Sequence, residues 1–170
     1  MQGLKGEFFM KRIIIHWTAG TGSPNSVDKQ HYHYLIDSKG KIHNGIFTPE
    51  DNLNCYDGRY AAHTGGGNTG SIGVAMCGMC GFKGADNVGK YPLTRVQCES
   101  MFKFVAELAK KYAIAVTSNN VMTHYEFGLK NPKTSSAGKI DIIHLPPFPG
   151  VPKDKIGDFI RNKIRWYLGK

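Results

Sequence analysis

The chain has 170 residues, of which 41% are hydrophobic, so its length and composition fit one globular domain and exclude a disordered tail. Its formal net charge of +9 at pH 7 indicates a polyanionic partner, such as a nucleic acid, an anionic lipid surface or an acidic polymer. No apolar run is long enough to cross a bilayer, and the first residues lack the pattern of a secretory signal peptide. We expect synthesis in the cytoplasm, an extension over residues 1–10 and one domain over residues 11–170.

The first half of the chain alternates strand and loop patterns. A run of β-branched residues predicts a strand over residues 11–17, and Ser26 is expected to cap a short helical turn. Residues 32–47 predict a strand, a tight turn at Ser38–Gly40 and a return strand. After a glycine-rich loop, the nearly all-apolar residues 71–78 predict a strand that is buried on both faces.

The second half contains the two clearest helices. Thr94 and Gln97 form a capping box, and apolar residues then recur at helical spacing at Met101, Phe104, Val105, Leu108 and Tyr112. A short strand follows and ends at His124, and a terminal helix is expected from about Asp154, with Ile156, Ile160, Ile164 and Tyr167 on one face. Strands that alternate with at least two helices predict an α/β or α+β domain with a central mixed sheet flanked by helices.

The four cysteines include one C-x-x-C pair, Cys77 and Cys80. A structural zinc site would need a second such pair, which is absent from the sequence. We therefore interpret the cysteines as reduced and structural, with a redox or metal role as the alternative.

Two of the seven histidines share a context. His16 and His124 each end a short apolar strand and precede an aromatic residue, and Asp141 follows later in the chain. If the two strands are neighbours that end at the same sheet edge, two imidazoles and a carboxylate would meet and leave one position open, as in a catalytic zinc site. The alternative is that strand-end histidines form local hydrogen bonds.

A series of motifs in fixed order resembles the zinc-dependent N-acetylmuramoyl-L-alanine amidases, which include phage lysozyme-type amidases, AmpD-type amidases and peptidoglycan recognition proteins. The motifs are IIIHWTAG, HYHYLIDSKGKI, AAHTGGGNTGSIGVAMCG, PLTRVQ, VMTHYEFG and GKID. The resemblance implies the fold of that group, a zinc amidase catalytic domain over residues 11–170, and one Zn²⁺ held by His16, His124 and Asp141. The third ligand is Asp in AmpD-type members and Cys in the phage lysozyme type.

The resemblance also implies roles for other residues. Lys139, two residues before the third ligand, matches the lysine that stabilises the oxyanion. Tyr32 resembles the tyrosine that faces the metal in the phage and recognition-protein branches. AmpD-type members instead carry a glutamate at the position of Ala75, so the identity of the proton-transfer group stays open.

The glycine-rich loop matches the wall of the substrate groove in this family. We expect His63 and Asn68 in that loop, together with Trp17, to contact a muropeptide. Strand alternation predicts that His31 and His33 share the face opposite Tyr32, where a separate metal pair is the alternative to a structural role.

The implied activity is hydrolysis of the amide between N-acetylmuramic acid and the L-alanine of the peptidoglycan stem peptide. We expect a phage or prophage endolysin that acts on the cell wall in the periplasm. The alternatives are a cytoplasmic amidase that recycles anhydro-muropeptides, an antibacterial effector injected into rivals, and a binding module that holds muropeptides without hydrolysis.

The last segment concentrates cations at Lys153, Lys155, Arg161, Lys163, Arg165 and Lys170. They are interpreted as a solvated helix face or as a surface that approaches the anionic lipids of the envelope. No nucleic-acid-binding motif is recognised, so we expect no specific nucleic acid partner and a monomer.

Overall fold

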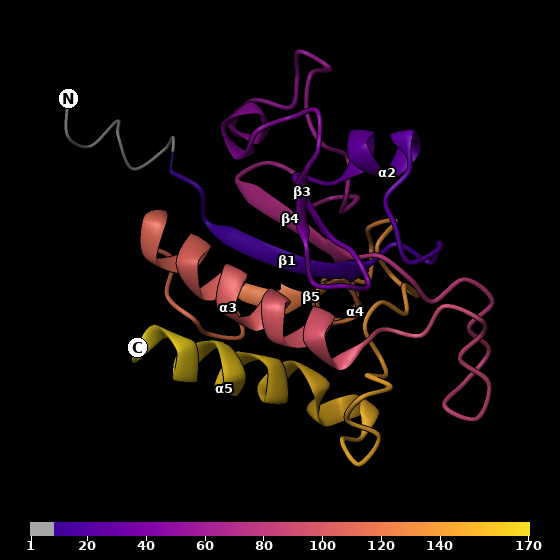
Figure 1. The fold of residues 1–170 in the computed structure, drawn as a ribbon. Coiled ribbons are helices and arrows are strands. Elements are labelled where there is room, and N and C mark those ends of the chain that lie inside the picture. The colour runs from indigo at the N-terminus through magenta and orange to yellow at the C-terminus, as the bar shows by residue number, and fades with distance from the viewer. Residues whose placement is uncertain (1–8) are drawn as a thin grey trace.

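The fold is built on one mixed five-stranded sheet, as the sequence predicts (Figure 1). The computed structural model describes residues 9–170, so most of the extension expected over residues 1–10 lies outside the described residues. The strands are β1 (Arg12–Trp17), β2 (Tyr34–Ile36), β3 (Ile42–Asn44), β4 (Ser71–Met76) and β5 (Val121–Thr123), and their order across the sheet is β3-β2-β4-β1-β5. Neighbouring strands pair in parallel except β2 and β3, which are antiparallel.

Two long helices cover one face of the sheet. Helix α3 (Arg95–Lys111) and helix α5 (Ile156–Leu168) lie side by side against it, and two shorter helices, α2 (Ser26–His31) and α4 (His124–Lys130), lie elsewhere (Figure 1). Short 3₁₀ turns occupy Pro49–Leu53 and Lys153–Lys155. No helix among residues 9–170 is long and apolar enough to cross a membrane.

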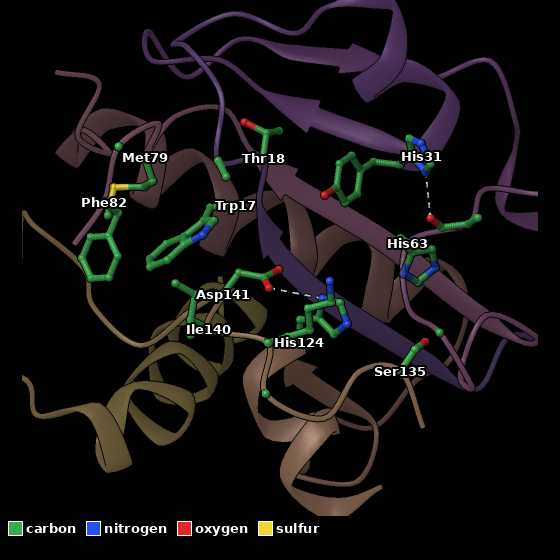
Figure 2. A pocket seen from close by; sticks show the side chains of 17 residues that line it. Trp17, Thr18, His31, His63, Met79, Phe82, His124, Ser135, Ile140 and Asp141 are labelled. Atoms are coloured by element: carbon green, nitrogen blue, oxygen red, sulfur yellow. Dashed lines mark hydrogen bonds and ion pairs between the residues drawn. The ribbon is translucent and has the colours of Figure 1, made fainter. Parts of the chain in front are cut away.

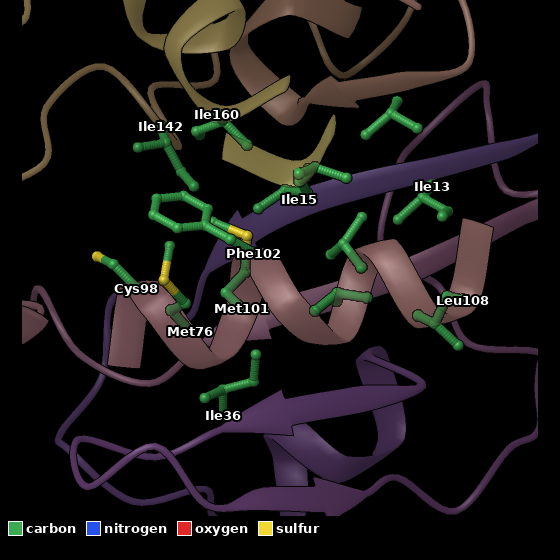
Figure 3. Close-up of a cluster of buried hydrophobic side chains, with 14 of the residues drawn as sticks. Ile13, Ile15, Ile36, Met76, Cys98, Met101, Phe102, Leu108, Ile142 and Ile160 are labelled. Carbon is green, nitrogen blue, oxygen red and sulfur yellow. The ribbon is translucent and has the colours of Figure 1, made fainter. Parts of the chain in front are cut away.

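The alternation of β1 separates the core from the other face of the sheet. Ile13 and Ile15 pack in the main core with α3 and α5, where Phe102 of α3 and Ile160 of α5 are also buried (Figure 3). Ile14 belongs to a separate cluster with Phe127 of α4. Because successive side chains of a strand point to opposite faces, His16 lies on the side away from α3 and α5.

Strand β4 is buried over its whole length, as predicted. Parallel partners on both edges and cover on both faces explain why it contains no exposed polar position. The four cysteines are free thiols: Cys77 and Cys98 are buried, and Cys80 is exposed.

Capping boxes begin three of the α-helices within residues 9–170, and the sequence analysis identified one of these boxes. Thr94 caps α3 together with Gln97, as predicted. Asn25, not Ser26, caps α2, because the Asn25 side chain accepts a hydrogen bond from the N–H of Asp28. Thr123 and Glu126 form a third box, so the chain passes directly from β5 into α4 at His124, a helix that the sequence analysis did not identify.

Arg161 is internal, which corrects its assignment to the basic surface of the last segment. It is 3% exposed, and its guanidinium donates two hydrogen bonds of 2.9 Å to the carboxylate of Glu126. It also donates to the backbone oxygen of Val121 at 3.0 Å and to Asp158 at 2.8 Å. A single side chain of α5 therefore ties together the start of β5 and the first turn of α4, which carries His124.

We predict that Arg161→Leu lowers the free energy of unfolding by about 2–3 kcal/mol, because it leaves the partly buried Glu126 carboxylate without its cation. Urea denaturation would measure this change. Lys163→Ala is the matched control in α5: its ammonium lies over the Phe159 ring, and its loss should cost under about 1 kcal/mol. An equal effect of the two substitutions would contradict the structural role of Arg161.

His33 is a buried neutral histidine. Its Nδ1 accepts from the N–H of Gly73 at 2.9 Å and its Nε2–H donates to Asn52 Oδ1 at 2.9 Å. Burial lowers the pKa of His33 from 6.5 to about 4. Between these two values the unfolded chain binds a proton that the folded chain does not, so acid destabilises the fold.

We predict that His33→Gln reduces the loss of stability between pH 6.5 and pH 4 by about 3 kcal/mol relative to the wild type, because one buried group no longer titrates. The unfolding free energy is measured by urea denaturation across this pH range with a chelator present. Parallel pH profiles of the two proteins would refute the prediction.

Candidate metal centre

Three side chains meet at one end of the parallel strands. The Nδ1 atom of His16 lies 3.2 Å from Nδ1 of His124 and 2.9 Å from Oδ2 of Asp141. The Nδ1 atom of His124 lies 3.3 Å from Oδ1 of Asp141. All three residues are buried, with 0%, 6% and 7% of their surfaces exposed. The structure thus brings together the three residues predicted as ligands; their binding of a metal stays a prediction.

The topology explains this meeting. Strands β1 and β5 are parallel neighbours, with Ile15 paired to Thr123, so the next residue of each chain segment is a histidine at the same edge. Asp141 comes from the loop after α4, and its backbone oxygen accepts a hydrogen bond of 2.6 Å from the N–H of Tyr125. This bond fixes the loop to the first turn of the helix that His124 begins.

The hydrogen bonds of His124 determine which of its nitrogens faces the group. Ser136 Oγ donates to the backbone oxygen of Gly65 at 2.7 Å, so the same hydroxyl is free to accept from His124 Nε2–H at 3.0 Å. In the neutral ring this leaves Nδ1 without a proton. That atom points toward His16 and Asp141.

A contact with His63 indicates which nitrogen of His16 faces the group. His63 Nε2–H donates to the backbone oxygen of Ser71 at 3.2 Å, so His63 Nδ1 is an acceptor and lies 3.1 Å from His16 Nε2. Burial lowers the pKa of His16 to about 4 and that of His63 well below its ordinary value, so both rings are neutral at pH 7. The acceptor at His63 Nδ1 favours the tautomer in which His16 carries its proton on Nε2 and presents the lone pair of Nδ1.

The resulting set of atoms suits a cation. Burial raises the pKa of Asp141, but hydrogen bonds from His124 and His16 lower it below the usual value, so the group is a carboxylate. These bonds need a ring proton on Nδ1, and a metal ion would take the place of that proton. Two nitrogen lone pairs and a carboxylate repel one another in a buried place unless a positive charge lies among them. Two histidines and one aspartate with a further open position are the donor set of a catalytic zinc site.

A cavity of about 750 Å³ opens over this group (Figure 2). Its lining falls into an apolar end, with Trp17, Met79, Phe82 and Ile140, and a polar end, with His31, His63 and Ser135. His124 and Asp141 form part of its floor between the two ends. The ring centroids of Trp17 and Phe82 lie 5.1 Å apart, which stiffens the apolar end.

Tyr32 and Lys139 line the same cavity. The Tyr32 ring lies 5.1 Å from that of His16 and packs against the cluster that contains Ala75. Burial raises the pKa of Tyr32, and the charge of Asp141 adds to this, so its hydroxyl remains protonated at neutral pH. Lys139 is exposed at the cavity rim, with no ion-pair partner within the described part of the chain.

The predicted pairing of His31 and His33 on one strand face is wrong. His31 is the last residue of α2, so strand alternation does not apply to it. Its side chain lines the cavity with Tyr32, and its Nδ1 bonds to the backbone oxygen of Ala62 at 3.0 Å (Figure 2). His33 is 1% exposed and bonded to Asn52, so these two histidines form no metal pair.

The three predicted substrate contacts have different places. Trp17 and His63 line the cavity. Both ring nitrogens of His63 are bonded to protein atoms, so its contact with a substrate stays a prediction. Asn68 does not line this cavity: its Oδ1 accepts from the N–H groups of His63 and Thr64, and its placement does not support a direct contact.

Several residues of the site were not identified from sequence. Ser136 belongs to no predicted element, and no spacing rule connects it to His124. Met79, Phe82 and Ile140 form a cavity wall that depends on how three loops pack together.

Comparisons with known proteins agree with this architecture. The family model described as N-acetylmuramoyl-L-alanine amidase matches residues 7–139. Among solved structures, the chain is similar to N-acetylmuramoyl-L-alanine amidase LysC from Clostridium intestinale URNW, with a TM-score of 0.57, 18% identity, and coverage of 94% of this chain and 87% of that one. It is also similar to a point mutant of PlyL, with a TM-score of 0.53, 22% identity, and coverage of 93% and 87%. No curated protein matches. At these identities the likenesses establish the fold.

Proposed function

The chain belongs to the N-acetylmuramoyl-L-alanine amidase family, and we propose that it is a zinc-dependent enzyme that cleaves the amide between N-acetylmuramic acid and the L-alanine of the stem peptide. The observation that carries this proposal is the meeting of two Nδ1 lone pairs and a buried carboxylate at the floor of an open cavity. A module that only held muropeptides would not need this costly arrangement of buried donors.

His16, His124 and Asp141 would hold one Zn²⁺ per chain. When bound, the ion supplies a Lewis acid for the substrate carbonyl and makes a water nucleophile available near neutral pH. The chain itself holds the two rings and the carboxylate in place, and Trp17 and Phe82 restrict solvent at one side.

Lys139 and Tyr32 would act on the charges and protons of the reaction. Water adds its oxygen to the carbonyl carbon, the C–N bond breaks, and the leaving amine takes a proton. Lys139, a free cation at the rim, would stabilise negative charge on the carbonyl oxygen. Tyr32, a half-buried phenol whose raised pKa keeps it protonated, is suited to donate a hydrogen bond rather than to act as a base.

The net charge of +9 favours a polymeric anionic substrate, which supports an endolysin that acts on the cell wall of a bacterial host. Exposed cations of the last segment, such as Lys153 and Lys155, would assist the approach to the envelope; the buried Arg161 takes no part.

We predict that the zinc-loaded wild type releases free stem peptides from purified sacculi, and that chelation stops this release until Zn²⁺ returns. Asp141→Ala should abolish hydrolysis and zinc retention while muropeptide binding changes little. Mass spectrometry of the products and metal analysis of the same samples make both measurements. Intact sacculi and intact soluble muropeptides after treatment with the zinc-loaded wild type would overturn the proposal. Cleavage of soluble anhydro-muropeptides alone would instead identify a recycling amidase.

We predict that Tyr32→Phe and Lys139→Met each lower kcat by roughly 10²–10³-fold, because each removes one donor aimed at the reacting amide. Zinc content should stay at one per chain in both variants, since neither side chain belongs to the buried donor group. Steady-state kinetics on a soluble muropeptide would test this, with Lys83→Met as a control for the removal of an exposed lysine outside the cavity lining. A kcat within threefold of the wild type in both variants would contradict the assigned roles.

A further inference from the structure

The loop of residues 63–68 lies against both histidines of the metal centre. Its backbone is fixed by Asn68, whose Oδ1 accepts from the N–H of His63 at 3.0 Å and from that of Thr64 at 2.8 Å. Asn52 holds the far end of the loop by donating to the backbone oxygen of Asn68 at 3.1 Å. These three bonds hold the backbone at both ends of the loop.

The first contact of the loop runs through the His63 side chain. The ring lies directly on β4, where a Cβ at Gly73 would fall 2.5 Å from its atoms, so only glycine admits it there. The bond from His63 Nε2–H to the backbone oxygen of Ser71 fixes the ring's protonation. Thr64 Oγ1 lies 2.7 Å from His63 Nδ1. Nε2 of His16 lies 3.1 Å from His63 Nδ1 and 3.4 Å from Thr64 Oγ1.

The second contact runs through a backbone oxygen of the loop. Gly65 accepts the proton of the Ser136 hydroxyl, and this turns the oxygen of Ser136 into an acceptor for His124 Nε2–H. Ser136 is fully buried, so water does not replace either bond. One short loop thus supplies, directly or through Ser136, the hydrogen-bond partner of Nε2 in both His16 and His124.

We propose that His63 and Ser136, joined by the 63–68 loop, are positioning residues that hold His16 and His124 with a proton on Nε2 and the Nδ1 lone pair directed at the metal. This inference rests on the zinc site of the proposed function. It assigns to the glycine-rich loop a task separate from lining the substrate groove.

The physical consequence concerns ring orientation. A free imidazole binds a metal through either nitrogen, and each choice needs a different rotation of the ring. A hydrogen bond that ends on a backbone oxygen removes one choice and increases the electron density on the other nitrogen. Loss of such a partner typically weakens metal affinity by about 10–100-fold.

The first test is zinc affinity, measured by competition with a chromogenic chelator. Ser136→Ala and His63→Leu should each weaken Zn²⁺ binding by about 10–100-fold. His63→Asn and Ser136→Thr should keep most of the wild-type Zn²⁺ affinity. In the first variant Oδ1 of the asparagine replaces the Nδ1 acceptor, and in the second the hydroxyl is kept. Ser100→Ala is the matched control, because its hydroxyl donates a bond of the same length, 2.7 Å, to a backbone oxygen, that of Gly40, away from the site. Wild-type affinity in both Ser136→Ala and His63→Leu would overturn the proposal.

The second test reads the protons themselves by ¹H–¹⁵N NMR of the histidine rings, with and without Zn²⁺. In the wild type, Nε2–H of His16 and of His124 should exchange slowly with water in both states. Ser136→Ala should speed exchange at His124 alone, and His63→Leu at His16 alone. A wild type that binds no zinc yet shows both protected protons would refute the metal site and leave the positioning roles standing. Rings that lack a proton on Nε2, or exchange that neither substitution alters, would refute the positioning roles.

Discussion

The burial of three electron-pair donors at one point is the constraint on which the rest of the site depends. His16, His124 and Asp141 meet in a place from which water is largely excluded, and the contacts of the two Nε2 atoms favour rings whose Nδ1 lone pairs face the carboxylate. Such an arrangement is stable only if the surrounding structure holds it firmly, because the donors repel one another without a cation. The central strands and the helices packed on them hold these three groups in place.

The central place of β1 in the sheet supplies that rigidity. It lies between β4 and β5, and its isoleucines are fully buried on both faces. A strand with partners on both sides cannot shift its register without moving every apolar side chain to the wrong face. Arg161 adds a second restraint by joining α5 to the end of the sheet where α4 begins. The packing of the core therefore fixes the positions of His16 and His124, and contact between the two rings does not.

Strand-end reasoning predicted much of this from sequence, and its failures have physical causes. Apolar runs that end in histidine located His16 and His124, because parallel neighbours finish at one edge. Asp141 comes from a loop, whose path no periodicity describes. The pattern named it only as a candidate carboxylate, and the family resemblance assigned it to the ligand set. Arg161 was placed on the surface because helical charge patterns do not reveal a buried partner such as Glu126. Ser136 acts through a hydroxyl bonded to a loop distant in sequence, and local patterns carry no information on such contacts.

The departure at Ala75 also has a structural account. Ala75 pairs with His16 across β1 and β4, and the Tyr32 ring packs against its cluster. A short side chain on β4 leaves room for that ring beside the metal centre.

Among the residues that line the cavity, Asp141 is the one carboxylate, and it belongs to the donor group. The cavity lining of this chain therefore has no counterpart of the glutamate that AmpD-type members carry at the position of Ala75. The phenol of Tyr32, in the segment after α2, occupies the adjacent space, and its raised pKa keeps the hydroxyl protonated as a hydrogen-bond donor. In the proposed function, Tyr32 would therefore assist proton transfer to the leaving amine, and His16, His124 and Asp141 would hold the metal that supplies the nucleophile.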